Sequence, residues 1–365
     1  MFVAYLGIDP ITRKQKRTTR RGFKTEREAK IAEAKLQTEV QANGFLNNEI
    51  TTFKQVYDLW LEQYRNTVKE STYQQAMTTF KMMILPHFEN IAIKDITVPH
   101  CQKVLNEWYR TYSETKKGRI YASTIFEYAI SLKIITDNPF NHIKAPRKKS
   151  NQKHEIMKYY TSDELQQFLE LVKYNVLHHA LFRTLAFTGI RRGELMALTW
   201  NDIDFTNQTL SVNKTLAEGL NHRQFIIDTP KTRSSIRTIS VDSKTLEVLK
   251  EWRTQQRVLS LKHGHNTSSK HQEIFTNVET NKRLNRVYAN ETLNLICKKN
   301  NFKRITVHGF RHTHCSLLFE AGLSVQEVQD RLGHGDIQTT MGIYAHVTEK
   351  QREKVAEKFA NYVSF

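Results

Sequence analysis

Apolar residues in the first half of the chain recur at intervals of three and four, the spacing of a helix that buries one side. The clearest run follows Thr52, which forms a capping-box pair with Gln55. Its inward side chains are expected to be Phe53, Val56, Trp60 and Tyr64. Three similar helices are expected to begin near residues 71, 97 and 116. Together they predict an all-α domain over residues 50–143, with the aromatic and methionine side chains in its core.

Two of these helices carry further signals. Ser71 with Gln74 is a second capping-box pair, so Ser71 is expected to open the second helix. Pro86 is expected to stop that helix, because proline lacks an N–H and clashes with the preceding turn. In the fourth helix, Ile120 is expected to face inward together with Ile125.

The N-terminal residues show a different pattern. Residues 2–6 are typical of a short strand, and turn-forming residues separate them from a second strand that runs through a basic stretch. Thr25 with Glu28 then forms a capping box that opens a helix ending near Asn43. A small β-sheet with one helix is therefore expected over residues 1–45.

The second half of the chain mixes helices and strands. Thr161 with Glu164 is expected to open a helix, and an apolar helix follows at 177–188. Segments rich in β-branched residues and bounded by turn residues predict strands at 209–213, 224–228 and 237–241. Helical spacing then resumes. Residues 158–365 are expected to form an α+β, mainly helical domain, preceded by a basic linker at 144–157.

Charge narrows the range of partners. The 365 residues include 55 lysines and arginines against 37 acids, a formal charge of +18. Such an excess favours nucleic acid over the alternatives, which are a protein kept soluble by charge or one bound to an anionic membrane. The basic residues expected to contact DNA lie in the N-terminal hairpin and the linker: Arg13, Lys14, Lys16, Arg17, Arg20, Arg21, Arg147, Lys148 and Lys149. A two-stranded ribbon fits the major groove, although the same charges could simply protect a sheet edge from aggregation.

Other classes of protein are disfavoured. No apolar run approaches the roughly 18 residues of a membrane helix, and the first residues lack the apolar core of a signal peptide, so a cytoplasmic protein with no membrane partner is expected. The three cysteines are scattered and form no Cys-x-x-Cys pair, which favours neither a disulfide framework nor a zinc site.

Candidate chemistry gathers near the C-terminal end. His308 and Arg311 lie three residues apart on a helix expected from about Thr306, so their side chains leave one face. A later helix, opened by Ser324 and Glu327, is expected to end at Gly333 and to place His334 at its terminus. Tyr344 follows in a short apolar run. These cationic and donor groups are expected to surround an anion.

A metal site is the competing interpretation of this stretch. His308 and His312 are four residues apart and His314 is close by. Gly309 stands where a helical zinc motif would need glutamate, and no cysteine or carboxylate cluster completes the set. His312 and His314 are therefore expected to pack or cap locally.

The motifs taken together resemble the tyrosine recombinase (phage integrase) family. The order His-x-x-Arg, Leu-Gly-His and Thr-Thr-Met-x-x-Tyr-x-His is similar to the C-terminal half of that family. The family's upstream arginine box is matched at 188–195, where Arg191 takes the family position and Arg192 competes with it. Its hairpin lysine is matched by Lys231, with Lys214 as the alternative. The resemblance implies an integrase of a Gram-positive phage or an integrative conjugative element.

The resemblance also implies the chemistry. The catalytic set would be Arg191, Lys231, His308, Arg311, His334 and Tyr344. Tyrosine would attack a DNA phosphodiester to form a 3′-phosphotyrosine, the arginines would bind the phosphate oxygens, and the lysine would protonate the departing 5′ oxygen. The histidines would donate hydrogen bonds or assist proton transfer. For the upstream arginine, a structural ion pair with an acid such as Glu194 stays open as an alternative.

The implied fold is an arm-site DNA-binding domain, a SAM-like core-binding domain and a catalytic domain ending in an exchange helix near residues 348–363. The implied partners are double-stranded DNA at core and arm attachment sites, three further copies of the chain in a tetramer on DNA, an excisionase and a host DNA-bending protein. No cofactor or metal is expected. The alternatives are a non-catalytic DNA-binding regulator on the same fold, an Xer-like resolvase, or an enzyme resembling type IB topoisomerases.

Overall fold

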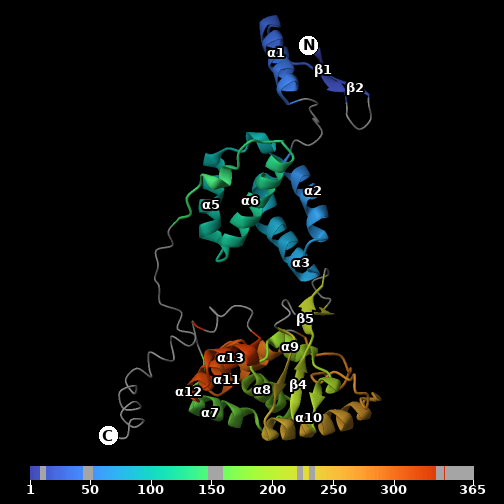
Figure 1. Ribbon diagram of the computed structural model, residues 1–365, viewed down its shortest axis with the longest axis vertical. Coiled ribbons are helices and arrows are strands. Elements are labelled where there is room, and N and C mark those ends of the chain that lie inside the picture. Colours follow the sequence, from blue (N-terminus) through green and yellow to red (C-terminus); the bar gives the residue numbers. More distant parts are fainter. Residues whose placement is uncertain are drawn as a thin grey trace, which may run out of the picture. The chain divides into compact units, whose positions relative to one another are not determined.

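The described residues fall into two compact units, one before and one after a division at Lys148. The computed structural model describes residues 1–8, 14–43, 52–146, 159–219, 225–229, 235–285, 287–333 and 341 (Figure 1). Within these ranges no helix is long and apolar enough to cross a membrane.

The first unit begins with an antiparallel hairpin of β1 (Phe2–Ile8) and β2 (Gln15–Arg20), supported by helix α1 (Glu26–Asn43). Ala4 and Leu36 form a small buried cluster between sheet and helix. The predicted cap is confirmed at Thr25, whose hydroxyl accepts from the Glu28 N–H at 3.2 Å. The Glu28 carboxylate accepts from the N–H of Lys24 at 3.0 Å, one residue earlier than in a reciprocal box.

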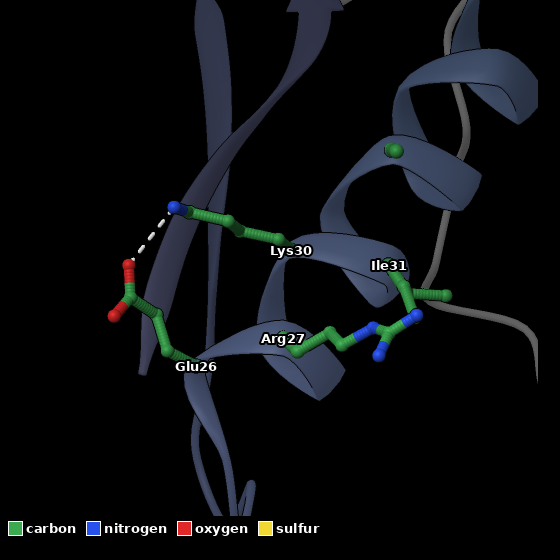
Figure 2. Close-up of a pocket in the computed structure, with 5 residues that line it drawn as sticks. Glu26, Arg27, Lys30 and Ile31 are labelled. Carbon is green, nitrogen blue, oxygen red and sulfur yellow. Dashed lines mark ion pairs between the residues drawn. The ribbon is translucent and has the colours of Figure 1, made fainter.

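The exposed face of the hairpin carries the apolar side chains of Val3 and Tyr5 beside polar ones. Tyr5 is paired with Arg17 across the hairpin, and both are exposed. On α1, Glu26 and Lys30 form an ion pair at 2.9 Å. Figure 2 shows Arg27 extending away from this pair, toward the exposed Ile31. The hairpin therefore presents basic side chains to solvent, as its sequence predicts.

A helical bundle makes up the rest of the first unit. Its elements are α2 (Phe53–Arg65), α3 (Glu70–Thr79), η1 (Phe80–Ile84), α4 (Leu85–Phe88), α5 (Val98–Thr111) and α6 (Thr115–Ser131). The reciprocal capping box of Thr52 and Gln55 is confirmed. Phe53, Phe126 and Trp108 pack around Phe88, and all four side chains are fully buried, as the helical spacing predicts.

Three local predictions in this bundle are wrong. Helix α3 begins at Glu70 after Lys69, so Ser71 lies inside the first turn and does not cap it. The helix continues through the π-helical turn η1 into α4, so Pro86 lies within the continued helix and does not stop it. Ile120 is 53% exposed, because the buried side of α6 is defined by Ala122, Ile125 and Ala129.

The second unit is mainly helical. Its helices are α7 (Ser162–Val172), α8 (Val176–Thr188), α9 (Arg192–Ala197), α10 (Ser243–Lys262), α11 (Tyr288–Lys299), α12 (Gly309–Glu320) and α13 (Val325–Leu332). The capping boxes at Thr161 and Ser324 are both confirmed. Phe168, Phe182 and Phe310 pack together and join α7, α8 and α12 around one core.

Two small antiparallel sheets lie beside these helices. Strand β4 (Thr209–Val212) pairs with β3 (Ile203–Asp204) on one side and with β7 (Arg237–Ser240) on the other. Strand β5 (Thr215–Glu218) pairs with β6 (Phe225–Asp228). The three predicted strands are confirmed, whereas β3 and β5 were not expected. The strand before Lys231 and the strand after it therefore belong to different sheets.

Candidate active site

The upstream arginine lies at a sharp turn between two helices. Helix α8 ends at Gly189, whose left-handed backbone (φ 63°) lets the chain reverse into α9. Arg191 is the N-terminal cap of α9, and its backbone N–H donates to the Glu194 carboxylate at 2.9 Å. Its guanidinium donates to the same carboxylate at 2.8 Å. The ion pair considered from the sequence thus exists, and it fixes where Arg191 points.

Arg311 lies in the first turn of α12 and is only 2% exposed. One end of its guanidinium donates to the backbone oxygen of Gly189 at 2.8 Å, and the other to that of Leu332 at 2.7 Å. Burial, and then the nearby charge of Arg191, lower the pKa of Arg311 to about 9, which still leaves it protonated at neutral pH. Arg311 therefore ties the turn after α8 to the end of α13.

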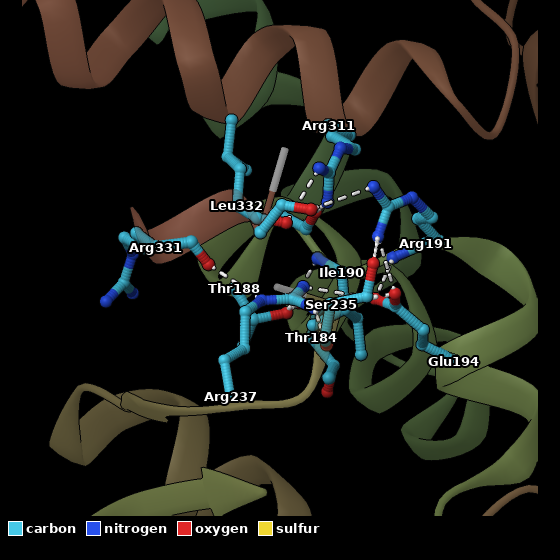
Figure 3. Close-up of polar contacts among 12 residues, drawn as sticks. Thr184, Thr188, Ile190, Arg191, Glu194, Ser235, Arg237, Arg311, Arg331 and Leu332 are labelled. Atoms are coloured by element: carbon cyan, nitrogen blue, oxygen red, sulfur yellow. Dashed lines mark hydrogen bonds and ion pairs between the residues drawn. The ribbon is translucent and has the colours of Figure 1, made fainter. Parts of the chain in front are cut away.

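Three arginines converge on the C-terminal end of α13 (Figure 3). The last carbonyls of a helix have no partner within it, and they carry the negative end of the helix dipole. Here the oxygens of three consecutive residues, 331 to 333, each accept from a different arginine. Arg237 donates at 2.9 Å, Arg311 at 2.7 Å and Arg191 at 3.1 Å.

A buried carboxylate lies under this cluster. Glu194 is 2% exposed and accepts from both Arg191 and Arg237, the latter at 3.1 Å. Burial alone would raise the pKa of Glu194, but the charge of Arg237 and the hydrogen bonds from both arginines outweigh it and hold that pKa below its usual value. With three arginines around one carboxylate, the cluster keeps an excess of positive charge.

His308 is the residue immediately before α12. Its ring lies perpendicular to that of His312, with 4.8 Å between their centroids. Desolvation, followed by the charges of His312 and Arg311, lowers the pKa of His308. The residue as a whole stays exposed, and the nearby cations act on its ring through space. His308 is thus expected to be neutral near pH 7 and able to accept a proton.

His314 has a structural role. Its Nδ1 donates to the backbone oxygen of Ala186 at 2.8 Å, so its Nε2 carries no proton and accepts from Arg331 at 3.0 Å. Burial and the charge of Arg331 lower the pKa of His314 to about 3, consistent with this neutral form. Across the described residues, histidine, cysteine and acidic side chains form no group of three that could hold a metal ion.

The structure thus brings together Arg191 and Arg311 and places His308 within reach of their charges. Lys231, His334 and Tyr344 lie outside the described residues. Lys214 donates to both oxygens of the buried Asp202, at 2.6 and 2.5 Å, so its ammonium group is held in a structural ion pair.

Of the basic residues expected to contact DNA, some lie in the described part of the chain and others do not. Lys14, Arg17, Arg20 and Arg21 are described and lie on or beside β2, where Lys16 also falls. Arg13, Arg147, Lys148 and Lys149 lie outside the described residues.

Sequence reasoning missed Arg237 and Arg331. Arg237 is partly buried and contacts both Glu194 and the end of α13. The β-branched residues of its segment predict a strand but give Arg237 no role. No signal in the local sequence could have identified Arg237, because its burial is decided by strand pairing that the local sequence does not specify.

Family models match three parts of the chain. Residues 158–351 match the phage integrase family, residues 52–109 match the N-terminal SAM-like domain of phage integrases, and residues 1–40 match an arm DNA-binding domain. The chain is therefore built from the three kinds of domain expected from its sequence.

Relatives match nearly the whole chain. It is 30% identical to the ICEBs1 integrase of Bacillus subtilis (strain 168), over 96% of this chain and 94% of that relative. It is 26% identical to the integrase of Staphylococcus phage L54a, over 91% and 99% of the two chains. A solved structure of the Tn1549 transposon integrase with transposon right end DNA shares its fold, with a TM-score of 0.68 at 20% identity over 84% and 99% of the chains. A lambda integrase tetramer bound to a Holliday junction gives a TM-score of 0.57 at 18% identity over 92% and 90%.

Proposed function

Because the chain belongs to the phage integrase family of tyrosine recombinases, we propose that Tyr344 is the nucleophile with which it cleaves and rejoins DNA. The chain is a site-specific recombinase that serves the integration of a mobile element. The phenol of Tyr344 would attack a phosphodiester, form a 3′-phosphotyrosine and release a 5′ hydroxyl. Attack by a hydroxyl of the partner strand would reverse the step, so that the energy of the phosphodiester bond is conserved.

The single observation that carries this proposal is the convergence of Arg191, Arg311 and Arg237 on the end of α13, directly before His334 in the sequence. Cleavage of a phosphodiester places extra negative charge on the nonbridging oxygens. Fixed guanidinium groups stabilise such charge without having to reorganise. Arg191 keeps 35% of its side-chain surface exposed, so its outer side is open to a phosphate.

The other catalytic residues complete the proton transfers. Lys231 would protonate the leaving 5′ oxygen, while His334 would donate a hydrogen bond to the phosphate. His308 is proposed as the acceptor of the tyrosine proton, because burial and the surrounding cations lower its pKa and so keep its imidazole unprotonated near pH 7. The same cations would favour the phenolate of Tyr344, whose ordinary pKa of about 10 is too high for much ionisation at neutral pH.

DNA would be bound by all three domains. In this proposal residues 1–45 bind arm sites through the exposed basic hairpin, residues 50–143 and 158–365 enclose the core site, and residues 144–157 cross the phosphate backbone between them. The basic excess of +18 supports this arrangement. We further propose a tetramer on two duplexes, joined by the segment after Tyr344. An excisionase and a host DNA-bending protein would set whether the element is integrated or excised, and recombination would take place in the cytoplasm.

Covalent attachment to DNA tests this function. The chain is incubated with a nicked duplex carrying the attachment core of its element, in EDTA, and the products are separated on a denaturing gel. A protein–DNA adduct is expected, and the Tyr344→Phe variant is expected to bind the duplex without forming one. Tight binding with no adduct from the unmodified chain would instead favour a non-catalytic regulator. An adduct that survives the substitution would show that another residue is the nucleophile.

A further inference from the structure

Arg237 stands outside the proposed catalytic set, yet it contacts both the buried carboxylate and the helix end that hold Arg191. Its guanidinium donates to the Glu194 carboxylate, to the backbone oxygen of Arg331 at 2.9 Å and to that of Ser235 at 3.0 Å. These bonds join β7, α9 and the end of α13. Ser235 also accepts from Arg191 at 3.4 Å, and it lies four residues after Lys231 in the sequence.

The pairing with Glu194 has an electrostatic consequence. The guanidinium of Arg191 lies 2.8 Å from this carboxylate, and a carboxylate so close would offset the charge that Arg191 can offer to a phosphate. Arg237 lies on the same carboxylate, and its side chain is only 6% exposed, so water screens the pair weakly. Glu194 therefore divides its negative charge between two cations, and Arg191 keeps a net attraction for an anion.

We infer that Arg237 is a positioning residue for DNA cleavage: it shares the charge of Glu194 so that Arg191 stays available to the scissile phosphate, and it fixes the end of α13 that precedes His334. This role rests on the proposed function. In this role Arg237 contacts neither the nucleophile nor the substrate. It acts through Arg191 and through the backbone of α13.

The test compares the rate of covalent attachment with the affinity for DNA. Arg237→Gln is expected to lower the attachment rate at saturating nicked duplex by about 100-fold, the size of effect that a small misplacement of a catalytic group produces. The dissociation constant for the same duplex, measured by fluorescence anisotropy, is expected to stay within about twofold, because a single buried charge adds little to a large phosphate contact. Arg237→Lys keeps the charge but loses the fork, and an intermediate rate is expected.

A double variant separates charge sharing from simple packing. In Arg237→Gln the full charge of Glu194 falls on Arg191, whereas Glu194→Gln combined with Arg237→Gln removes that charge as well. The double variant is therefore expected to attach faster than Arg237→Gln alone. A merely structural arginine predicts the opposite, since the second substitution removes another buried hydrogen-bonding group. Arg283→Gln is the matched control, because Arg283 pairs with Glu273 in the same unit, outside the arginine cluster.

Each outcome decides the inference. A normal rate in Arg237→Gln, or a double variant no faster than the single one, overturns it while leaving the nucleophile intact. If Arg237→Gln does not fold, Arg237→Lys decides alone: an intermediate rate at unchanged affinity supports the role, because the charge on Glu194 is still shared, whereas an unchanged rate or a loss of about 100-fold overturns it. Failure of the unmodified chain to form any adduct would instead remove the proposed function, and the role of Arg237 would fall with it.

Discussion

Replacement of Gly189 by alanine should destabilise the second unit more than the addition of a single methyl group suggests. Gly189 adopts φ 63° at the end of α8, and its backbone oxygen accepts from Arg311 at 2.8 Å. A Cβ built there would lie 2.6 Å from Cδ2 of His314 and 2.7 Å from a methyl carbon of Leu332. The His314 ring cannot easily move, because one ring nitrogen donates to the backbone oxygen of Ala186 and the other accepts from Arg331.

Two costs add in this variant. The left-handed backbone costs an L-residue about 1–2 kcal/mol relative to glycine. Overpacking of a filled interior costs about 1–3 kcal/mol more. Gly189→Ala is therefore expected to lose about 2–5 kcal/mol of unfolding free energy. At about 2–4 °C per kcal/mol for a unit of this size, the melting temperature should fall by roughly 10 °C.

Gly264→Ala is the matched control. Gly264 also has a left-handed backbone (φ 79°), but a Cβ there meets nothing within 4 Å. This variant should show the backbone cost alone, about 1–2 kcal/mol. The two free energies come from urea unfolding followed by circular dichroism. Equal losses in the two variants would refute the close contacts with His314 and Leu332 as a source of destabilisation.

Two further predictions follow from the described contacts. The pKa of Glu194 is lowered in the folded chain, so its ion pairs stabilise the fold above the ordinary pKa of 4.5, and that contribution is lost as the pH falls toward the folded value. The stability difference between the unmodified chain and Glu194→Gln, measured by urea unfolding, should therefore shrink between pH 7 and pH 3; a constant difference would contradict the pairing. In the helical bundle, Thr52→Ala should cost about 1 kcal/mol because it removes a reciprocal cap. Ser71→Ala should cost almost nothing because α3 begins at Glu70, and equal losses would mean that Ser71 caps after all.

Local signals in the sequence determined the parts of the fold that are held by neighbouring residues. The capping boxes at Thr52, Thr161 and Ser324 all formed, because each bond joins residues three positions apart. Gly189 and Gly333 ended their helices for the same reason, since a left-handed residue closes the last turn locally. The helix start predicted at Ser71 and the helix end predicted at Pro86 were wrong, because packing of the bundle decided where those helices begin and end.

The sequence alone also indicated the family, and it led to the proposal of Arg191, His308 and Arg311, since their motifs lie within short segments in the order of the family. Only the tertiary structure decided what holds them. The bonds from Arg237 to Glu194 and from Arg311 to the turn after α8 join residues 43 and 122 positions apart. Such contacts depend on which strands pair and which helix ends meet, and those are set by burial over the whole unit, which no local pattern specifies.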